Sequence, residues 1–249
     1  MKKGPLLNVL LALLVFTVLS ILFSNPVRAY TYDDFNAAEV FPSVKWNDTG
    51  LNPGLFSVPG DGYLHFIDTD GYSQDILRSV DPVSGAFVVS MAYSIQSVNN
   101  TGTASPEGSS VNLFLGGSGT AVGVWESNLS GAYWFAAGES VNGTTTAGAW
   151  VSTNVTSGML GIAYNGLLGS GGVASAWYND GTGWKELYEF TPNFQNTPYI
   201  IIVGYDLYGN SLSFDVDYVQ ITSVPEPTTL LLLGLGLIGL VGVRRKFTK

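Results

Sequence analysis

The sequence predicts an all-β protein, a two-sheet antiparallel sandwich with an apolar helix at each end. Apolar and polar residues alternate along Phe87–Ile95 and again along Leu212–Tyr218, the period of two that is typical of strands with one buried face. Clusters of Gly, Asn and Ser separate many short apolar segments. Between residues 30 and 223, no stretch of ten or more residues repeats its apolar positions every 3.6 residues, as an amphipathic helix would.

Each strand is predicted from a short apolar or alternating segment bounded by turn residues. The continuous apolar run Tyr199–Val203 indicates a central strand covered on both faces. The turn Asn179–Gly183 joins two aromatic-rich segments and predicts a hairpin with Gly at positive φ. The expected strands are Tyr63–Asp68, Phe87–Ile95, Val111–Leu115, Val122–Glu126, Ala132–Ala136, Ala149–Val155, Met159–Tyr164, Val173–Tyr178, Trp184–Phe190, Tyr199–Val203 and Leu212–Tyr218.

The charges are distributed unevenly along the 249 residues. The chain carries −9 overall, but residues 30–223 hold only three cations, Lys45, Arg78 and Lys185, against 18 acids, a balance of −15. Such an acidic surface repels phosphate backbones, so we expect no nucleic-acid partner. The absence of cysteine excludes disulfides and Cys-based zinc sites.

The first 29 residues are predicted to be a secretory signal peptide. Lys2 and Lys3 precede the apolar run Leu6–Phe23, and Ala29 supplies a small residue before a cleavage site at Tyr30. The length of the apolar run leaves an uncleaved signal anchor as the alternative. Residues 30–223 would then form the folded domain.

The C-terminal segment, residues 224–249, has three parts in a fixed order. They are the tetrapeptide Val224-Pro225-Glu226-Pro227, the apolar run Leu230–Val243 and the basic cluster Arg244-Arg245-Lys246. A basic cluster at the end of a membrane span stays on the cytoplasmic side, which places the acidic domain on the opposite side. A plain C-terminal anchor with a proline-rich linker is the alternative, but the run is shorter than the ~20 residues of an ordinary span.

This three-part pattern resembles the PEP-CTERM sorting signal of Gram-negative bacteria. The resemblance implies recognition by an exosortase, a membrane protease or transpeptidase, with release or transfer near Pro225-Glu226-Pro227. It implies a membrane-anchored precursor that reaches the cell surface or the extracellular space. Proteins with this signal are associated with exopolysaccharide and biofilm.

The middle of the chain resembles the concanavalin A-like lectin/glucanase jelly roll. Asp33-Asp34-Phe35-Asn36 followed by Trp46 is similar to the first strand of that superfamily, and Ser213–Ile221 is similar to its closing strand. The resemblance implies a jelly-roll sandwich; other jelly rolls and immunoglobulin-like sandwiches are alternatives. It also implies a structural Ca²⁺ that joins the first and last strands, with Asp34 and Asp217 as the matching residues.

The sequence lacks the residue patterns of the common hydrolases. Retaining glucanases of this fold place two Glu and an Asp at alternate positions of one strand, whereas none of the seven Glu residues has an Asp two positions later. Glu186 and Glu189 would lie on opposite faces of a strand. His65, the single histidine, is expected to be packed or hydrogen-bonded, and there is no nucleophile elbow for a triad. We therefore expect no enzyme, with an atypical cross-strand carboxylate pair as the alternative.

The aromatic residues are the remaining candidates for ligand binding. All six tryptophans lie in the middle of the chain, where core packing is the usual role of large aromatics. Trp177 and Trp184 flank the predicted hairpin turn, where exposure and stacking on a sugar are more plausible. The sequence thus predicts an exported, exosortase-sorted surface or matrix protein with a glycan- or matrix-binding sandwich. A carbohydrate-active hydrolase and a purely structural biofilm or adhesion protein are the alternatives.

Overall fold

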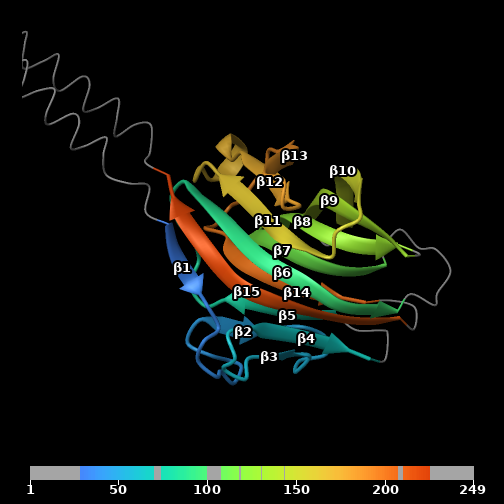
Figure 1. Ribbon diagram of the computed structural model, residues 1–249. Helices are drawn as coiled ribbons and strands as arrows, with labels where there is room; N and C mark the ends of the chain where they lie inside the picture. The colour runs from blue at the N-terminus through green and yellow to red at the C-terminus, as the bar shows by residue number, and fades with distance from the viewer. Residues whose placement is uncertain are drawn as a thin grey trace, which may run out of the picture.

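The computed structural model describes residues 29–69, 74–99, 108–117, 119–129, 131–142, 144–206 and 210–224. These residues form two antiparallel sheets packed against each other, as Figure 1 shows. The helical element among them is a 3-10 turn at Gly169–Gly171. No helix in the described part of the chain is long and apolar enough to cross a membrane. The two expected terminal helices lie outside the described residues.

The two sheets have different strand orders. The eight-stranded sheet runs β13 (Trp184–Phe190), β12 (Ala174–Asn179), β11 (Ser157–Tyr164), β6 (Phe87–Asn99), β15 (Ser211–Ser223), β4 (Leu64–Asp68) and β3 (Phe56–Ser57), with β1 (Ala29–Asp33) also paired to β15. The seven-stranded sheet runs β10 (Thr144–Thr153), β9 (Ala132–Val141), β8 (Thr120–Leu129), β7 (Ser109–Gly117), β14 (Tyr199–Tyr205), β5 (Gln74–Ser79) and β2 (Trp46–Asp48).

The predicted sandwich and its alternating pattern are confirmed. In β6, the side chains of Phe87, Val89, Met91, Tyr93 and Ile95 are buried between the sheets. The strand Tyr199–Val203 corresponds to β14, which is central because β7 and β5 flank it. The outer face of this strand is less buried than predicted, since the side chains of Tyr199, Ile201 and Tyr205 are only half-buried.

The core between the sheets is built from large aromatic and aliphatic side chains. Phe66 of β4 stacks on Phe214 of β15 with ring centroids 4.9 Å apart, and Phe56 packs against both rings. Each fully buried side chain of this size contributes roughly 1.5–3 kcal/mol relative to exposure. Burial of this kind stabilises the packing of the two sheets against each other.

A buried carboxylate fixes the N-terminal strand. Asp33, which is 2% exposed, accepts hydrogen bonds from Trp46 Nε1 at 2.7 Å and from Lys45 Nζ at 2.9 Å. Trp46 belongs to the seven-stranded sheet, so this contact connects β1 to the opposite layer. The pair Ala29↔Thr222 brings the start of β1 to the end of β15, and Figure 1 shows both at the same end of the sandwich.

Candidate functional site

Trp184 is an exposed aromatic ring on the outer face of the eight-stranded sheet. It retains 44% of its surface exposed at the start of β13, as predicted for this hairpin. A Cβ added to Gly161 of β11 would fall 2.9 Å from Trp184 Cζ3, so the indole lies over that glycine. Trp177, on β12 between the two, is half-buried, and its buried Nε1 has no hydrogen-bond partner among the described residues.

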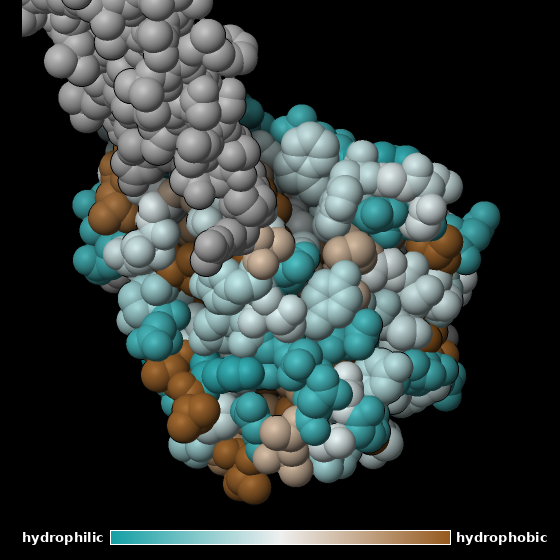
Figure 2. Space-filling model, turned by 60° about the vertical axis from the view of Figure 1, so that its left-hand side comes forward, coloured by the Kyte–Doolittle hydropathy of each residue, from teal (hydrophilic) through white to brown (hydrophobic). Residues whose placement is uncertain are grey.

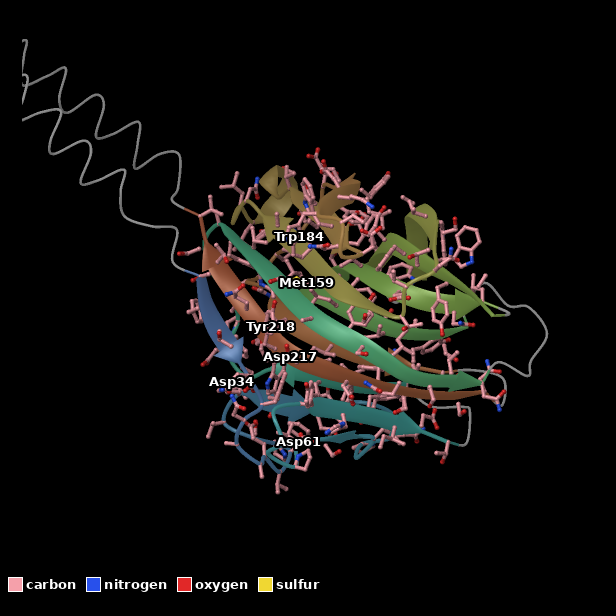
Figure 3. The ribbon with its side chains drawn as sticks, viewed as in Figure 1. Asp34, Asp61, Met159, Trp184, Asp217 and Tyr218 are labelled. Carbon is pink, nitrogen blue, oxygen red and sulfur yellow. The ribbon has the colours of Figure 1, made fainter. Side chains whose placement is uncertain are left out.

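A row of outward-facing residues continues from Trp184 across the sheet. Strand pairing aligns Trp184 with Asn179, Asn179 with Met159, Met159 with Ala92, and Ala92 with Tyr218. Figure 3 shows Trp184, Met159 and Tyr218 following one another over the strands of this face. The Tyr218 hydroxyl approaches Met159 Sδ at 3.8 Å above the small Ala92 side chain. The row therefore forms a path from an aromatic ring to β15.

The row ends in a polar hollow of about 340 Å³ beside β15. A bulge in β15 directs Asp217 outward beside Tyr218. Thr31 of β1, the loop after β1 and the loop before β4 supply the rest of the wall, and Figure 3 shows Asp34, Asp61 and Asp217 on this side of the sheet. The hollow is lined by Thr31, Asp34, Asn36, Asp61, Gly62, Tyr63, Asp217 and Tyr218.

His65 ties one wall of the hollow to the sheet. Its Nδ1 lies 2.6 Å from Asp215 Oδ1 and its Nε2 lies 3.0 Å from Asp61 Oδ2. Partial burial would lower the pKa of His65, but the hydrogen bonds to Asp215 and Asp61 outweigh it and raise the pKa. The histidine is hydrogen-bonded as predicted, and its contacts hold the loop that carries Asp61.

The predicted calcium residues are brought together in part. Asp34 and Asp217 line the same hollow, but no three His, Cys, Asp or Glu side chains of the described residues are grouped closely enough to hold a metal ion. Calcium takes six to eight oxygen ligands. Two carboxylates and the nearby Asn36 would supply only part of such a set, so a Ca²⁺ bound here would need further oxygen ligands such as water.

The other notable carboxylates are buried and hold structure. Burial and a hydrogen bond with Asp48 raise the pKa of Asp75 to about 6, and Asp75 accepts the backbone N–H of Leu55 at 3.1 Å. Glu126 of β8 is fully buried and bonds to the Tyr93 hydroxyl of β6. Both groups face the interior of the sandwich, so neither presents a carboxylate pair to a groove.

The face of the molecule seen in Figure 2 is polar rather than broadly apolar. Figure 2 shows a hydrophilic band across the lower half of one face, with hydrophobic residues in separate patches near the rim. A hydrophilic surface with isolated rings suits a hydroxyl-rich ligand better than an apolar partner.

The remaining predicted positions lie at the ends of the described chain. Ala29 and Tyr30, the predicted cleavage site, are exposed in β1. Val224 directly follows β15 and donates its N–H to the Ala86 carbonyl at 2.8 Å. The remaining sorting residues, Pro225, Glu226, Pro227, Arg244, Arg245 and Lys246, lie outside the described residues.

The C-terminal pattern has a known counterpart. Residues 223–246 match the PEP-CTERM protein-sorting motif. The chain carries a PEP-CTERM sorting motif. This motif implies a secreted protein that an exosortase processes, as the sequence predicts. No curated protein matches the chain.

Solved structures share the jelly-roll fold of the middle. The GH43 BlXynB protein from Bacillus licheniformis superposes with a TM-score of 0.57 at 11% identity, covering 77% of this chain and 39% of that one. The Ca²⁺/Man2-bound VIP36 exoplasmic/lumenal domain superposes with a TM-score of 0.54 at 10% identity, covering 80% of this chain and 88% of that one. The legume lectin-like domain from Entamoeba histolytica superposes with a TM-score of 0.51 at 12% identity, covering 72% of this chain and 90% of that one. The chain spans about two fifths of the GH43 protein, and these likenesses concern the fold alone.

Sequence reasoning missed the path that links Trp184 to the hollow. Asp61, Met159 and Tyr218 carry no motif, and strand register alone brings them together. A usable signal was Gly161 inside the predicted strand Met159–Tyr164, because a glycine within a strand often marks a place where another group approaches closely.

Proposed function

We propose that this exosortase-sorted protein reaches the surface or matrix of a Gram-negative bacterium and there binds a glycan without cleaving it. The binding face is the outer face of the eight-stranded sheet, from Trp184 to the hollow beside Asp217. The observation that carries the proposal is the exposed Trp184 ring lying over Gly161, in line with the polar hollow.

The dimensions of this face suit a short stretch of a sugar chain. Trp184 covers β11, and β6 separates β11 from Tyr218 on β15. Two strand spacings are about 10 Å, so a chain of a few sugar rings would reach from the indole to the hollow. Aromatic rings offer an apolar face to a sugar ring, while its hydroxyls need polar partners.

The chemistry of the hollow favours neutral sugars or amino sugars. Carboxylates accept hydrogen bonds from hydroxyl or ammonium groups, and the hollow offers three of them, Asp34, Asp61 and Asp217. Acidic sugars would be repelled there. An exopolysaccharide with neutral or amino-sugar units is the ligand that we propose.

The non-catalytic part of the proposal is supported by the role of the buried carboxylates. Hydrolysis needs two carboxyl groups flanking a bound glycosidic bond. Asp75 with Asp48, and Glu126, instead stabilise loops and the core. In the hollow, the hydrogen bond from Asn36 lowers the pKa of Asp34, and the hydrogen bond with His65 outweighs desolvation and lowers the pKa of Asp61, whereas the general acid of a hydrolase needs a raised pKa. Calcium at Asp34 and Asp217 is a secondary part of the proposal, and its support is two carboxylates in one hollow and the Ca²⁺-bound form of the neighbour VIP36.

A glycan array tests the binding. The full chain in mild detergent, with and without Ca²⁺, should bind neutral or amino-sugar glycans, and Trp184→Ala should weaken this binding at least ~10-fold, the loss of one well-stacked ring. Trp150→Ala is the matched control, because Trp150 is a comparably exposed tryptophan on the seven-stranded sheet. Absence of any glycan binding, or equal losses in both variants, would contradict the proposed site. Release of new reducing ends from a bound glycan would contradict the non-catalytic assignment.

A further inference from the structure

We propose a second binding site, for a carboxylate-bearing sugar, in a hollow on the outer face of the seven-stranded sheet with Arg78 as its anchor. The hollow has a volume of about 560 Å³ and lies over β5, β7 and β14. It belongs to the opposite sheet from the Trp184 face, so it does not rest on the function proposed above.

Arg78 differs from the two other cations of the acidic domain. Lys45 is paired with Asp33 at 2.9 Å, and Lys185 is paired with Asp180 at 2.7 Å. Arg78 has no carboxylate within ion-pair distance among the described residues. A cation left unpaired in a domain with many acids is available for an anionic ligand.

The guanidinium group of Arg78 is held in a defined place. Its Cζ lies 4.8 Å from the centroid of the Tyr199 ring on the adjacent β14 strand. This cation–π contact holds the guanidinium beside the ring, and the N–H donors of a guanidinium lie around its edge. A planar fork of N–H donors matches a carboxylate, which it can bind through two parallel hydrogen bonds.

The rest of the hollow suits the body of a sugar. Gly116 forms part of its floor, where an added Cβ would fall 2.4 Å from Ile201 Cδ1. Gln195, Asn196 and Thr197 supply amide and hydroxyl groups at the wall, and no Asp or Glu is among the lining residues. The volume lies within the usual range for small-ligand pockets, ~300–1,000 Å³.

The loops around the hollow are fastened to one another. Val83 donates its N–H to the Pro198 carbonyl, and Gly169 donates its N–H to the Phe194 carbonyl, both at 2.8 Å. Ile200 N–H is bonded to Ser79 Oγ at 3.1 Å. Walls that are already ordered lose little conformational entropy when a ligand binds.

Calorimetric titration with matched trisaccharides tests this site. A trimer of a uronic acid should bind the full chain in detergent. The affinity of the neutral trimer of the same linkage should be the same for the parent and for the Arg78 variants. Arg78→Gln should weaken uronate binding ~10- to 100-fold, the usual worth of a charge-assisted hydrogen-bond pair. Arg78→Lys should recover only part of the affinity, because a lysine ammonium lacks the planar fork.

Lys185→Gln is the matched control, since it removes one positive charge from the other sheet and should leave uronate binding unchanged. Trp184→Ala should also leave it unchanged, which separates failure of this site from failure of the first. Uronate binding that survives Arg78→Gln in a variant with native circular dichroism would overturn the proposal, as would no uronate binding at all. A sulfated trimer that binds as tightly as the uronate would overturn the carboxylate assignment.

Discussion

Glu126 is the residue at which the core departs most from simple apolar packing. Its carboxyl is fully buried, one oxygen bonds to the Tyr93 hydroxyl, and Oε1 has no hydrogen-bond partner among the described residues. Burial raises the pKa of Glu126 to about 7, although the bond from Tyr93 opposes the shift. The side chain is therefore neutral in weakly acidic solution and charged in basic solution.

We predict that Glu126 makes the protein less stable as the pH rises. Because the folded pKa of about 7 exceeds the ordinary value of 4.5, its stabilising contribution is complete below pH 4.5 and is lost as the pH rises through 7. At ~1.36 kcal/mol per pKa unit, the free energy of unfolding falls by on the order of 3 kcal/mol from this group. Glu126→Gln should remove this part of the pH dependence in urea unfolding measured at pH 5 and pH 8.

Asp75, whose pKa is also raised, contributes to the same slope, so the quantity to compare is the difference between variant and parent. Glu186→Gln, at an exposed position, is the control and should keep the slope of the parent. An unchanged slope in Glu126→Gln would show that the buried carboxyl is not the titrating group.

At the scale of single elements, the sequence predicts long strands well and short ones poorly. The alternating segments Phe87–Ile95 and Leu212–Tyr218 lie within β6 and β15. By contrast, β2 and β3 have three and two residues, too few to show a period. Their positions depend on contacts such as Trp46 with Asp33, which join segments 13 residues apart.

The candidate site was predictable only in its parts. The exposure of Trp184 follows from its place beside a hairpin turn. The proximity of Asp34 to Asp217 follows from the resemblance to lectin-like jelly rolls. By contrast, the row that leads from Trp184 through Met159 to Tyr218 depends on the register of five strands and on a bulge at Asp217. Register is set by pairing between distant segments, which a single sequence does not display.

We predict that Gly161→Ala separates binding from stability. The added Cβ would meet the edge of the Trp184 ring, a group on an exposed edge strand that can move at little cost. The unfolding free energy should change by less than ~1 kcal/mol, because the strand itself gains a better strand former than glycine. Two measured quantities should decrease in this variant: the affinity for glycan, and the size of the change in Trp184 fluorescence when glycan binds.

Gly171→Ala serves as the control, because its added Cβ would meet nothing closer than 3.6 Å. If Gly161→Ala binds glycan as the parent does, the position of the Trp184 ring is not part of the site.

At the scale of the whole molecule, the folded domain and its sorting segment are directly joined. The PEP-CTERM motif begins at residue 223, the last residue of β15, so no linker separates the sandwich from the signal. The bond from Val224 N–H to Ala86 extends the ordered backbone into the first residues of the motif. The processing enzyme must therefore approach close to the end of the sandwich.

We predict that replacing Pro225-Glu226-Pro227 with three alanines blocks processing. In the parent bacterium, the variant should accumulate as a full-length precursor in the membrane fraction, while the native chain is released or transferred. Immunoblots of membrane and medium fractions would measure this. Replacing Leu51-Asn52-Pro53, an exposed turn of the domain, with alanines is the control. Normal processing of the motif variant would refute the role of the motif.

The position of β15 also determines how the domain carries mechanical load. Tension on the segment after Ser223 pulls β15 along its own axis, and this strand is bonded to β6 over nearly its whole length and to β4 and β1 along its other edge. The backbone hydrogen bonds of β15 are thus loaded in shear and must break together. At an edge strand pulled away sideways, the hydrogen bonds would instead break one at a time. While the chain is tethered through its C-terminus, drag on a glycan bound at the proposed face would be borne by the centre of the eight-stranded sheet.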